Sequence, residues 1–219
     1  IRDGGSPYSR VRSVEVGVRA EDAKKRYTSS LAVFDTFVDN ELVFEAEAGG
    51  YETENASTRR GVVGTFVARP TSWLLASTSL SIVDAVFTTL VPGVSHYVPN
   101  VPPVLFRVDA TVHHKLGAFR GSPVTGRVSL GYTFLAGKHL TDSITGPSTN
   151  ALNAGAAVRY QFVEIGVEGY NLLGLQYPDD AEYYVSNWSV KPGQQLASNA
   201  IHLTAAPPTT VLGSLGLYF

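Results

Sequence analysis

Short segments in which apolar and polar residues alternate recur along this chain of 219 residues. The alternation is clearest in three segments, whose apolar positions are Phe106, Val108, Ala110 and Val112, then Val128, Leu130, Tyr132 and Phe134, then Leu152, Ala154, Ala156, Val158 and Tyr160. Successive side chains of a β-strand point to opposite faces of a sheet. Each segment therefore predicts a strand with one apolar face and one face of charges, hydroxyl groups or glycine. We count about nine such segments, which predicts an all-β fold.

The composition excludes several classes of function. Cysteine and methionine are absent, which excludes disulfide bonds, cysteine nucleophiles and thiolate metal sites. The net charge is −2 and there is no basic tract, so we expect no nucleic-acid partner. The longest apolar runs contain only a few residues, so no transmembrane helix is expected. A membrane location would require a closed β-barrel, because only helices and barrels satisfy their backbone polar groups in lipid.

The lengths of the connections distinguish a transmembrane barrel from a soluble β-sandwich, since both folds show the alternation. Short connections at 20–26, 70–72, 116–123 and 160–163 alternate with long ones at 39–57, 87–103, 136–150 and 173–208. Short turns at one end and long loops at the other are typical of a transmembrane antiparallel β-barrel with periplasmic turns and extracellular loops. Ser77, Ser79 and Ser81 share one face of a strand, which fits a wet interior. The sequence favours the barrel, and the sandwich is the alternative.

One expected strand, residues 27–38, cannot be assigned to faces from its pattern. Four apolar residues, Leu31 to Phe34, follow one another without a polar residue between them. Either a β-bulge or an apolar surface on both sides of the strand would explain this run.

The last residues of the chain, 209–219, form another expected strand with apolar or small residues at alternate positions. Such a strand, ending on an aromatic residue, resembles the closing strand of bacterial outer-membrane β-barrels. In those proteins the strand is the signal that the barrel-assembly machinery reads. The resemblance implies this role for Val211, Leu215, Leu217 and Phe219. An ordinary terminal strand of a sandwich would show the same alternation.

A series of short motifs extends the resemblance over nearly the whole chain. They are 13–17, 31–34, 60–63, 69–71, 98–103, 130–132, 169–173 with Tyr177, and 207–209. Their order and spacing resemble the carboxy-terminal part of a TonB-dependent outer-membrane receptor, so residues 1–219 are expected to be the carboxy-terminal portion of its β-barrel. The chain departs from that family at Val63, where an acidic residue is frequent.

The resemblance implies both a complete fold and a transport function. The complete barrel would have about 22 strands, of which this chain supplies about nine, and it would be filled by an amino-terminal plug that this chain lacks. The implied function is uptake of a scarce nutrient across the bacterial outer membrane, such as a ferric siderophore, haem, cobalamin or a glycan. A TonB-type inner-membrane complex would supply the energy through the plug.

A sheet of nine strands cannot close with both chain ends on one side of the membrane, and its two edges would leave backbone groups unpaired in the lipid bilayer. We therefore expect a partner chain, or a missing amino-terminal segment, to supply the plug and the remaining strands. Residues 1–9 would be an extracellular loop, where a proteolytic nick or a split gene is plausible. The alternative is a receptor-like barrel that serves as a scaffold subunit of a larger outer-membrane complex.

Two groups of residues are candidates for the functional site. The first group is expected to line the lumen and bind the plug through ion pairs and water, with substrate conduction as the alternative: Glu15, Arg19, Arg107, Asp109, Arg127, Arg159, Glu164 and Glu168. The second group is expected to contact a ligand from the extracellular loops, with simple packing over the barrel mouth as the alternative: His96, Tyr97, Tyr183, Tyr184 and Trp188.

The sequence indicates no enzyme, metal site or cofactor. His113 and His114 are adjacent on a strand and point to opposite faces, so they cannot share a metal. Glu164 and Glu168 share a face but are separated by roughly 13 Å, too far for an acid/base pair. No Ser/His/Asp constellation converges on one face. An acidic loop is expected to be solvated, with calcium binding as the alternative, and it contains Glu45, Glu47, Glu52 and Glu54.

Overall fold

The computed structural model describes residues 8–45, 50–53, 55–90, 95–187 and 197–219. Within these residues all regular structure is β. The strands are β1 (Val11–Glu21), β2 (Tyr27–Val38), β3 (Leu42–Glu45), β4 (Gly50–Thr53), β5 (Ser57–Thr71), β6 (Leu74–Phe87), β7 (Val104–Phe119), β8 (Ser122–Leu135), β9 (Thr149–Tyr160), β10 (Val163–Tyr170), β11 (Pro178–Asn187), β12 (Ala197–Ala205) and β13 (Thr210–Leu217). Among the described residues there is no helix long and apolar enough to cross a membrane.

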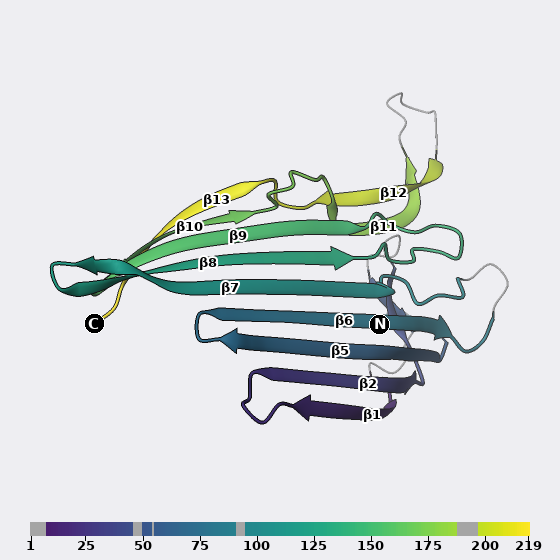
Figure 1. Cartoon of the computed structure of the whole chain (residues 1–219). Helices are drawn as coiled ribbons and strands as arrows, with labels where there is room; N and C mark the ends of the chain where they lie inside the picture. Colours follow the sequence, from purple (N-terminus) through teal and green to yellow (C-terminus); the bar gives the residue numbers. More distant parts are fainter. Residues whose placement is uncertain (1–7, 46–49, 54, 91–94, 188–196) are drawn as a thin grey trace.

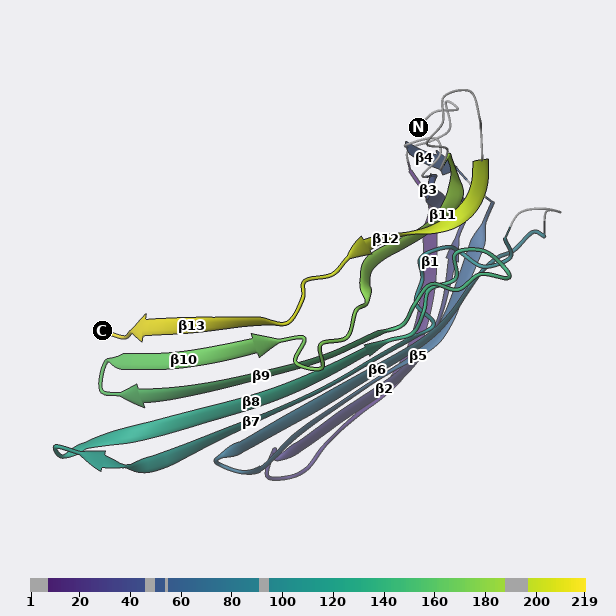
Figure 2. The same ribbon diagram turned by 90° about the horizontal axis from the view of Figure 1, so that it is seen from above.

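Nine of these strands form one antiparallel sheet in the order β1-β2-β5-β6-β7-β8-β9-β10-β13. Neighbours in the sheet are therefore neighbours in sequence, apart from the two small hairpins inserted in long connections (Figure 1). Seen from above, the sheet curves like a section of a cylinder wall (Figure 2). The predicted number of strands in the wall is confirmed. Within the described residues, β1 and β13 are the edges of the sheet.

Two long connections contain more structure than the sequence predicts. β3 pairs with β4 inside the connection 39–57, and β11 pairs with β12 inside 173–208. Both hairpins lie at the end of the sheet where the long connections gather (Figures 1 and 2). The prediction of plain loops for these two ranges is therefore incomplete, although their position between strands of the wall is correct.

The prediction of a short connection over 116–123 is wrong in its extent. β7 continues to Phe119 and β8 begins at Ser122, so the turn consists of Arg120 and Gly121. Both turn residues have positive φ, 48° and 80°, as a two-residue hairpin turn of the favoured twist requires. A register shift between Lys115 and Gly117 marks a bulge that breaks the alternation and hides the strand end in the sequence.

The pairing of β2 shows how the four consecutive apolar residues, Leu31 to Phe34, are distributed between the two faces of the sheet. β2 pairs without a register shift with both β1 and β5, so this strand has no bulge. Leu31 and Val33 are half exposed on one face of the sheet, and Phe34 lies on the other face, opposite Gly61. The run therefore reflects an apolar surface on both sides of the strand.

One face of the sheet carries apolar side chains from one edge strand to the other. Its exposed members include Val14, Val16, Val18, Leu31, Val33, Val62, Phe66, Leu80, Ile82, Val128, Leu130, Val158, Ile165, Val167, Val211, Leu215 and Leu217. In water such an exposed surface would be strongly unfavourable, because burying one large apolar side chain lowers the free energy by about 1.5–3 kcal/mol. An apolar outer face opposite a polar inner face is the arrangement of a transmembrane β-barrel.

The small buried core lies at the loop end of the sheet. It is formed by Val43 of β3, Ala85 and Phe87 at the end of β6, and Val98 in the following connection. Beside it, fully buried Ser57 donates to Glu41, and Arg59 pairs with the same carboxylate at 2.8 Å. Burial raises the pKa of Glu41, but hydrogen bonds from Arg59 and Ser57 outweigh it and hold the pKa below its usual range. The β3–β4 hairpin is thus packed onto the rim of the sheet.

The motif 169–173 has a structural role where β10 ends, on the side of the sheet where the long connections lie. Asn171 has a positive φ of 49° and is 5 % exposed. Its amide nitrogen donates to the carbonyl groups of Leu175 at 3.0 Å and Pro207 at 3.4 Å, and its own carbonyl accepts from Thr209 at 2.7 Å. Asn171 therefore ties the two ends of the β11–β12 insertion together and directs the chain back to the wall at β13.

Candidate functional site on the inner wall and in the loop layer

Strand register decides which residues share the polar face of the sheet. One straight row crosses seven strands through Arg19, Ser30, Thr65, Ser79, Arg107, Thr133 and Ala151. Because side chains alternate along each strand, every second residue from this row lies on the same face. All the charged residues expected in the lumen satisfy that condition: Glu15, Arg19, Arg107, Asp109, Arg127, Arg159, Glu164 and Glu168. We call this face the inner wall; its contact with a plug stays a prediction.

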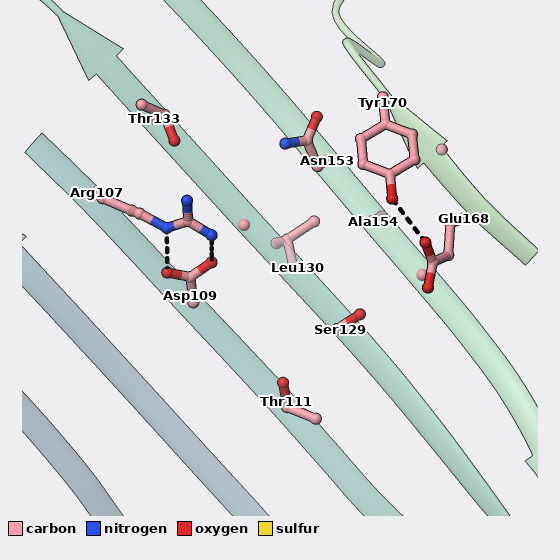
Figure 3. Close-up of a pocket in the computed structure, with 13 residues that line it drawn as sticks. Arg107, Asp109, Thr111, Ser129, Leu130, Thr133, Asn153, Ala154, Glu168 and Tyr170 are labelled. Carbon is pink, nitrogen blue, oxygen red and sulfur yellow. Dashed lines mark hydrogen bonds and ion pairs between the residues drawn. The ribbon is translucent and has the colours of Figure 1, made fainter. Parts of the chain in front are cut away.

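The inner wall is hollowed where β7, β8, β9 and β10 run side by side, and the cavity has a volume of about 220 Å³ (Figure 3). Its rim carries Arg107, Asp109, Glu168 and Tyr170, with Thr111, Ser129, Thr133 and Asn153 between them. Two glycines make the hollow. A Cβ atom on Gly131 would lie 2.7 Å from the Asp109 carboxylate, and one on Gly155 would lie 3.0 Å from the Ser129 hydroxyl. We call this cavity the wall groove.

The three charged side chains of the wall groove lie in two hydrogen-bonded groups. Arg107 binds Asp109 through two hydrogen bonds of 2.7 and 2.9 Å, a bidentate ion pair along one strand. Across the groove the Tyr170 hydroxyl donates to Glu168 at 2.7 Å (Figure 3). Asp109 is thus neutralised, whereas Glu168 keeps its charge and a second oxygen. The groove can accept a cationic or hydrogen-bond-donating group, and it contains no arrangement of nucleophile and base.

A second polar cluster lies nearer the turn end of the inner wall. Arg127 approaches Glu164 at 3.6 Å, and Arg159 lies over the Tyr218 ring, 4.0 Å from its centroid. Tyr218 donates to Glu164 at 3.4 Å. Six of the eight predicted charges therefore fall into two clusters, and Glu15 and Arg19 lie apart from them on the edge strand β1.

The loop candidates His96 and Tyr97 belong to a cluster that sequence reasoning found only in part. Tyr97 stacks on His139, with ring centroids 3.9 Å apart, and His96 contacts Tyr97 at 5.5 Å. His139 was not a candidate, and no local pattern could have indicated it, because it lies in a different connection. Asp142 from that second connection accepts from the His96 backbone amide and from Ser95 at 3.1 Å.

The remaining candidates lie on the β11–β12 hairpin. Tyr184 stacks on His202 with centroids 3.7 Å apart, and both line a cavity of about 520 Å³ together with Asp180 and Glu182. Tyr183 is half-buried on the same strand. Trp188 lies outside the described residues. His202, like His139, had no signal in the sequence.

The connection 136–148 joins the two aromatic clusters. Its His139 stacks on Tyr97, while its Lys138 pairs with Asp180 of β11 at 3.6 Å. The Ala181 side chain is buried against Gly146 of the same connection. We call the connections 88–103 and 136–148 together with β11–β12 the loop layer. Within the part of the chain that the structure describes, no group of three or more His, Asp or Glu side chains could hold a metal ion.

Replacing Asp142 by alanine is expected to loosen the contact between connections 88–103 and 136–148. The His96 amide lowers the pKa of Asp142, and the Ser95 hydroxyl also lowers it against the effect of burial. A lowered pKa means that the contact is stabilised at neutral pH and is lost only as the pH falls below about 4. Amide hydrogen exchange of residues 95–98 should become several-fold faster in the variant at pH 7.

Ser143→Ala, an exposed change one residue away, is the matched control for this experiment. It should leave the exchange of residues 95–98 unchanged. Equal exchange rates for wild type and Asp142→Ala at pH 7 would show that the carboxylate does not hold the two connections together.

The curved sheet, with its apolar outer face and charged inner wall, defines the class of this protein as a transmembrane antiparallel β-barrel. Residues 9–172, which are more than half of the chain, match the family model described as TonB dependent receptor-like, beta-barrel. The chain therefore belongs to the TonB-dependent receptor family, and the resemblance seen in the sequence motifs is confirmed.

The fold is similar to that of the ferric-catecholate import receptor Fiu from E. coli K12 in its closed form. The TM-score is 0.69 and the identity is 15 %, so the likeness concerns the fold. The match covers 96 % of this chain and 28 % of the Fiu chain. No curated protein matches the sequence. The fold expected from the sequence, a nine-stranded portion of a larger barrel, is confirmed by these comparisons.

Proposed function

We propose that this chain is part of an outer-membrane receptor that takes up a scarce nutrient in a TonB-dependent manner. The observation that carries the proposal is the inner wall of a TonB-dependent receptor barrel, which is charged, hollowed and free of catalytic geometry over the described residues. Transport through such a barrel requires conformational release of a plug and no covalent chemistry. Polar groups on the inner wall would bind the plug through contacts weak enough to be broken.

The plug and the remaining strands would come from outside the 219 residues. The edge strands β1 and β13 support this part of the proposal, because an unpaired edge in lipid costs several kcal/mol for each unsatisfied backbone group. Candidate ligands are ferric siderophores, haem, cobalamin and glycans. Ferric catecholates are the first to test, since the structural neighbour Fiu imports them. Aromatic side chains of the loop layer would make the first contact with the ligand.

Purification from outer membranes in mild detergent tests the assembly. Every polypeptide that travels with this chain should be identified by denaturing gel and mass spectrometry. A stoichiometric partner, or a continuous longer chain, that carries a plug with a TonB-contact motif supports the receptor. Recovery of the chain alone as a stable, soluble monomer would contradict the membrane barrel.

Uptake measurements test the role of the wall groove. In cells that depend on the receptor, we expect Glu168→Lys to lower energised uptake at least fivefold without lowering the amount of folded receptor. The reversed charge would repel a cationic group entering the groove and would break the hydrogen bond from Tyr170. Glu21→Lys, the same change on the inner face at the end of β1, is the control and should transport normally. Equal uptake by both variants would exclude a role for the groove.

A second candidate function, a scaffold subunit of a larger outer-membrane complex, is favoured by one observation on the outer face. Asp35 and Arg60 form an ion pair at 2.8 Å there, and Asp84 faces Arg60 from the next strand. Arg60 is 69 % exposed, and such a polar group on an outer face suits a protein partner. A stoichiometric partner without a plug or a TonB-contact motif would support the scaffold.

A further inference from the structure

The hairpin that ends in Arg120 and Gly121 carries positive charge without any carboxylate near it in the sequence. We call residues 113–127 the β7–β8 tip. It contains Lys115, Arg120 and Arg127 and not one carboxylate, in a chain whose net charge is −2. Arg127 is paired with Glu164, but Lys115 and Arg120 form no ion pair among the described residues. The tip therefore presents uncompensated cationic charge.

The tip projects beyond its neighbour on the β6 side. β6 begins at Leu74, which pairs with Val112, so β7 runs on past that end to Phe119 (Figure 1). All residues from His113 to Gly121 are exposed. This projection occurs at the end of the sheet where the short connections lie.

The projecting hairpin is held in place by its own contacts. Leu116, released by the bulge, lies directly over Gly126, where a Cβ atom would come within 3.0 Å of its methyl group. Phe119 packs edge-on against Tyr160 of β9, with centroids 5.6 Å apart. Gln161 from the β9–β10 turn donates to Ser122 at 3.0 Å. The tip is therefore a formed surface whose geometry is set before anything binds.

The outward face of the tip is apolar up to its end. Leu116 and Phe119 are 60 % and 56 % exposed, and they continue the apolar outer face of the sheet past β6. The Arg120 guanidinium lies against the Phe119 ring, 5.5 Å from its centroid. An exposed ring beside a guanidinium at the end of a membrane strand is suited to the boundary between acyl chains and headgroups.

The β1–β2 turn offers a direct comparison inside the same chain. There Arg26 lies over the Tyr27 ring at 5.6 Å, nearly the same geometry. In that turn, however, Asp22 pairs with Arg26 at 3.5 Å and accepts a hydrogen bond from the Tyr27 amide. The guanidinium of Arg26 is thus neutralised, whereas that of Arg120 is available to an external anion.

We propose that the β7–β8 tip binds the phosphate of an anionic phospholipid, with Arg120 as the main contact. Lys115 adds to the positive potential from the inner side of the tip, and Leu116 with Phe119 lies against the acyl chains. The inference rests on the proposed function, because the short connections would then face the periplasm and the lipid would belong to the inner leaflet. An acidic protein partner is less well matched, since the outward side of the tip continues the lipid-facing surface.

The test uses the complete receptor, with every strand and its plug, reconstituted in vesicles of phosphatidylcholine containing a minor fraction of phosphatidylglycerol. Insertion is measured first, by protection from protease and by heat-modifiable migration. Native mass spectrometry then counts the phosphatidylglycerol molecules that remain bound. Each basic residue near an anionic surface strengthens binding roughly fivefold, so Arg120→Gln should lower retention about fivefold. Arg120→Lys should restore most of it.

Arg26→Gln is the matched control, because it removes the same type of residue from the same type of aromatic contact where Asp22 already pairs with the guanidinium. It should change retention less than twofold. Failure of the wild type to insert would overturn the proposed function and the inference with it. Normal insertion would overturn the inference alone if retention were equal for both lipids, if Arg26→Gln lost as much as Arg120→Gln, or if an acidic peptide displaced the lipid.

Discussion

Val128→Arg is expected to destabilise the barrel by roughly 2–4 kcal/mol, the cost of placing a cation on the lipid face near the middle of the bilayer. Val128 lies near the centre of β8, is 58 % exposed, and points to the apolar outer face of the sheet. The complete receptor, folded into vesicles and titrated with urea, should show a lower midpoint. Its heat-modifiable band should also be weaker in outer membranes.

The neighbouring change Ser129→Arg provides the control. Ser129 follows Val128 directly, so its side chain points to the opposite, inner face. There it lines the wall groove, beside Gly155 and near the carboxylates of Asp109 and Glu168. An arginine there would point into a wet space with negative charge, so its effect on stability should be small. Equal destabilisation by both arginines would contradict the assignment of inner and outer faces.

Gly61→Ala is expected to lower the free energy of unfolding by about 1–3 kcal/mol, the usual cost of overpacking. Gly61 lies opposite Phe34 on the inner wall, and the aromatic ring covers the glycine. A Cβ atom would lie 2.6 Å from the ring and would also press on the Ile82 carbonyl of β6. Because one of these groups is backbone, the strands themselves would have to separate. Urea unfolding of the complete receptor measures the effect.

Gly64→Ala on the same strand is the control, because it also replaces a glycine but creates no steric clash. At Gly64 the nearest atoms to a Cβ would be at 3.6 and 3.8 Å, ordinary contact distances. Alanine in a strand is favoured over glycine by roughly 0.5–1 kcal/mol, so this variant should be as stable as the wild type or more so. A similar loss in both variants would show that the ring of Phe34 does not determine the need for glycine.

The sequence predicted the two faces of the wall because period-two alternation is a local property. Residues such as Arg107 and Asp109 show their face through their immediate neighbours, and the register then extends that face from strand to strand. Strand ends were less predictable. At the β7–β8 tip the bulge after Lys115 interrupts the alternation, so the sequence placed the end of β7 several residues too early.

The loop layer was predictable only in outline. An aromatic residue such as Tyr97 signals a contact, but its partner His139 lies in another connection and is chosen by the folded chain. The wall groove was beyond sequence reasoning for a similar reason. It depends on Gly131 and Gly155 falling on one face beside Asp109 and Glu168, which only the register of adjacent strands determines.

The contacts within the loop layer have a consequence for motion. Connection 136–148 is fastened on one side to Tyr97 through His139 and on the other side to Asp180 through Lys138. Movement of His139 or Lys138 away from its present position would break the contact with Tyr97 or with Asp180. A change at one of these contacts is therefore expected to affect the neighbouring segment as well.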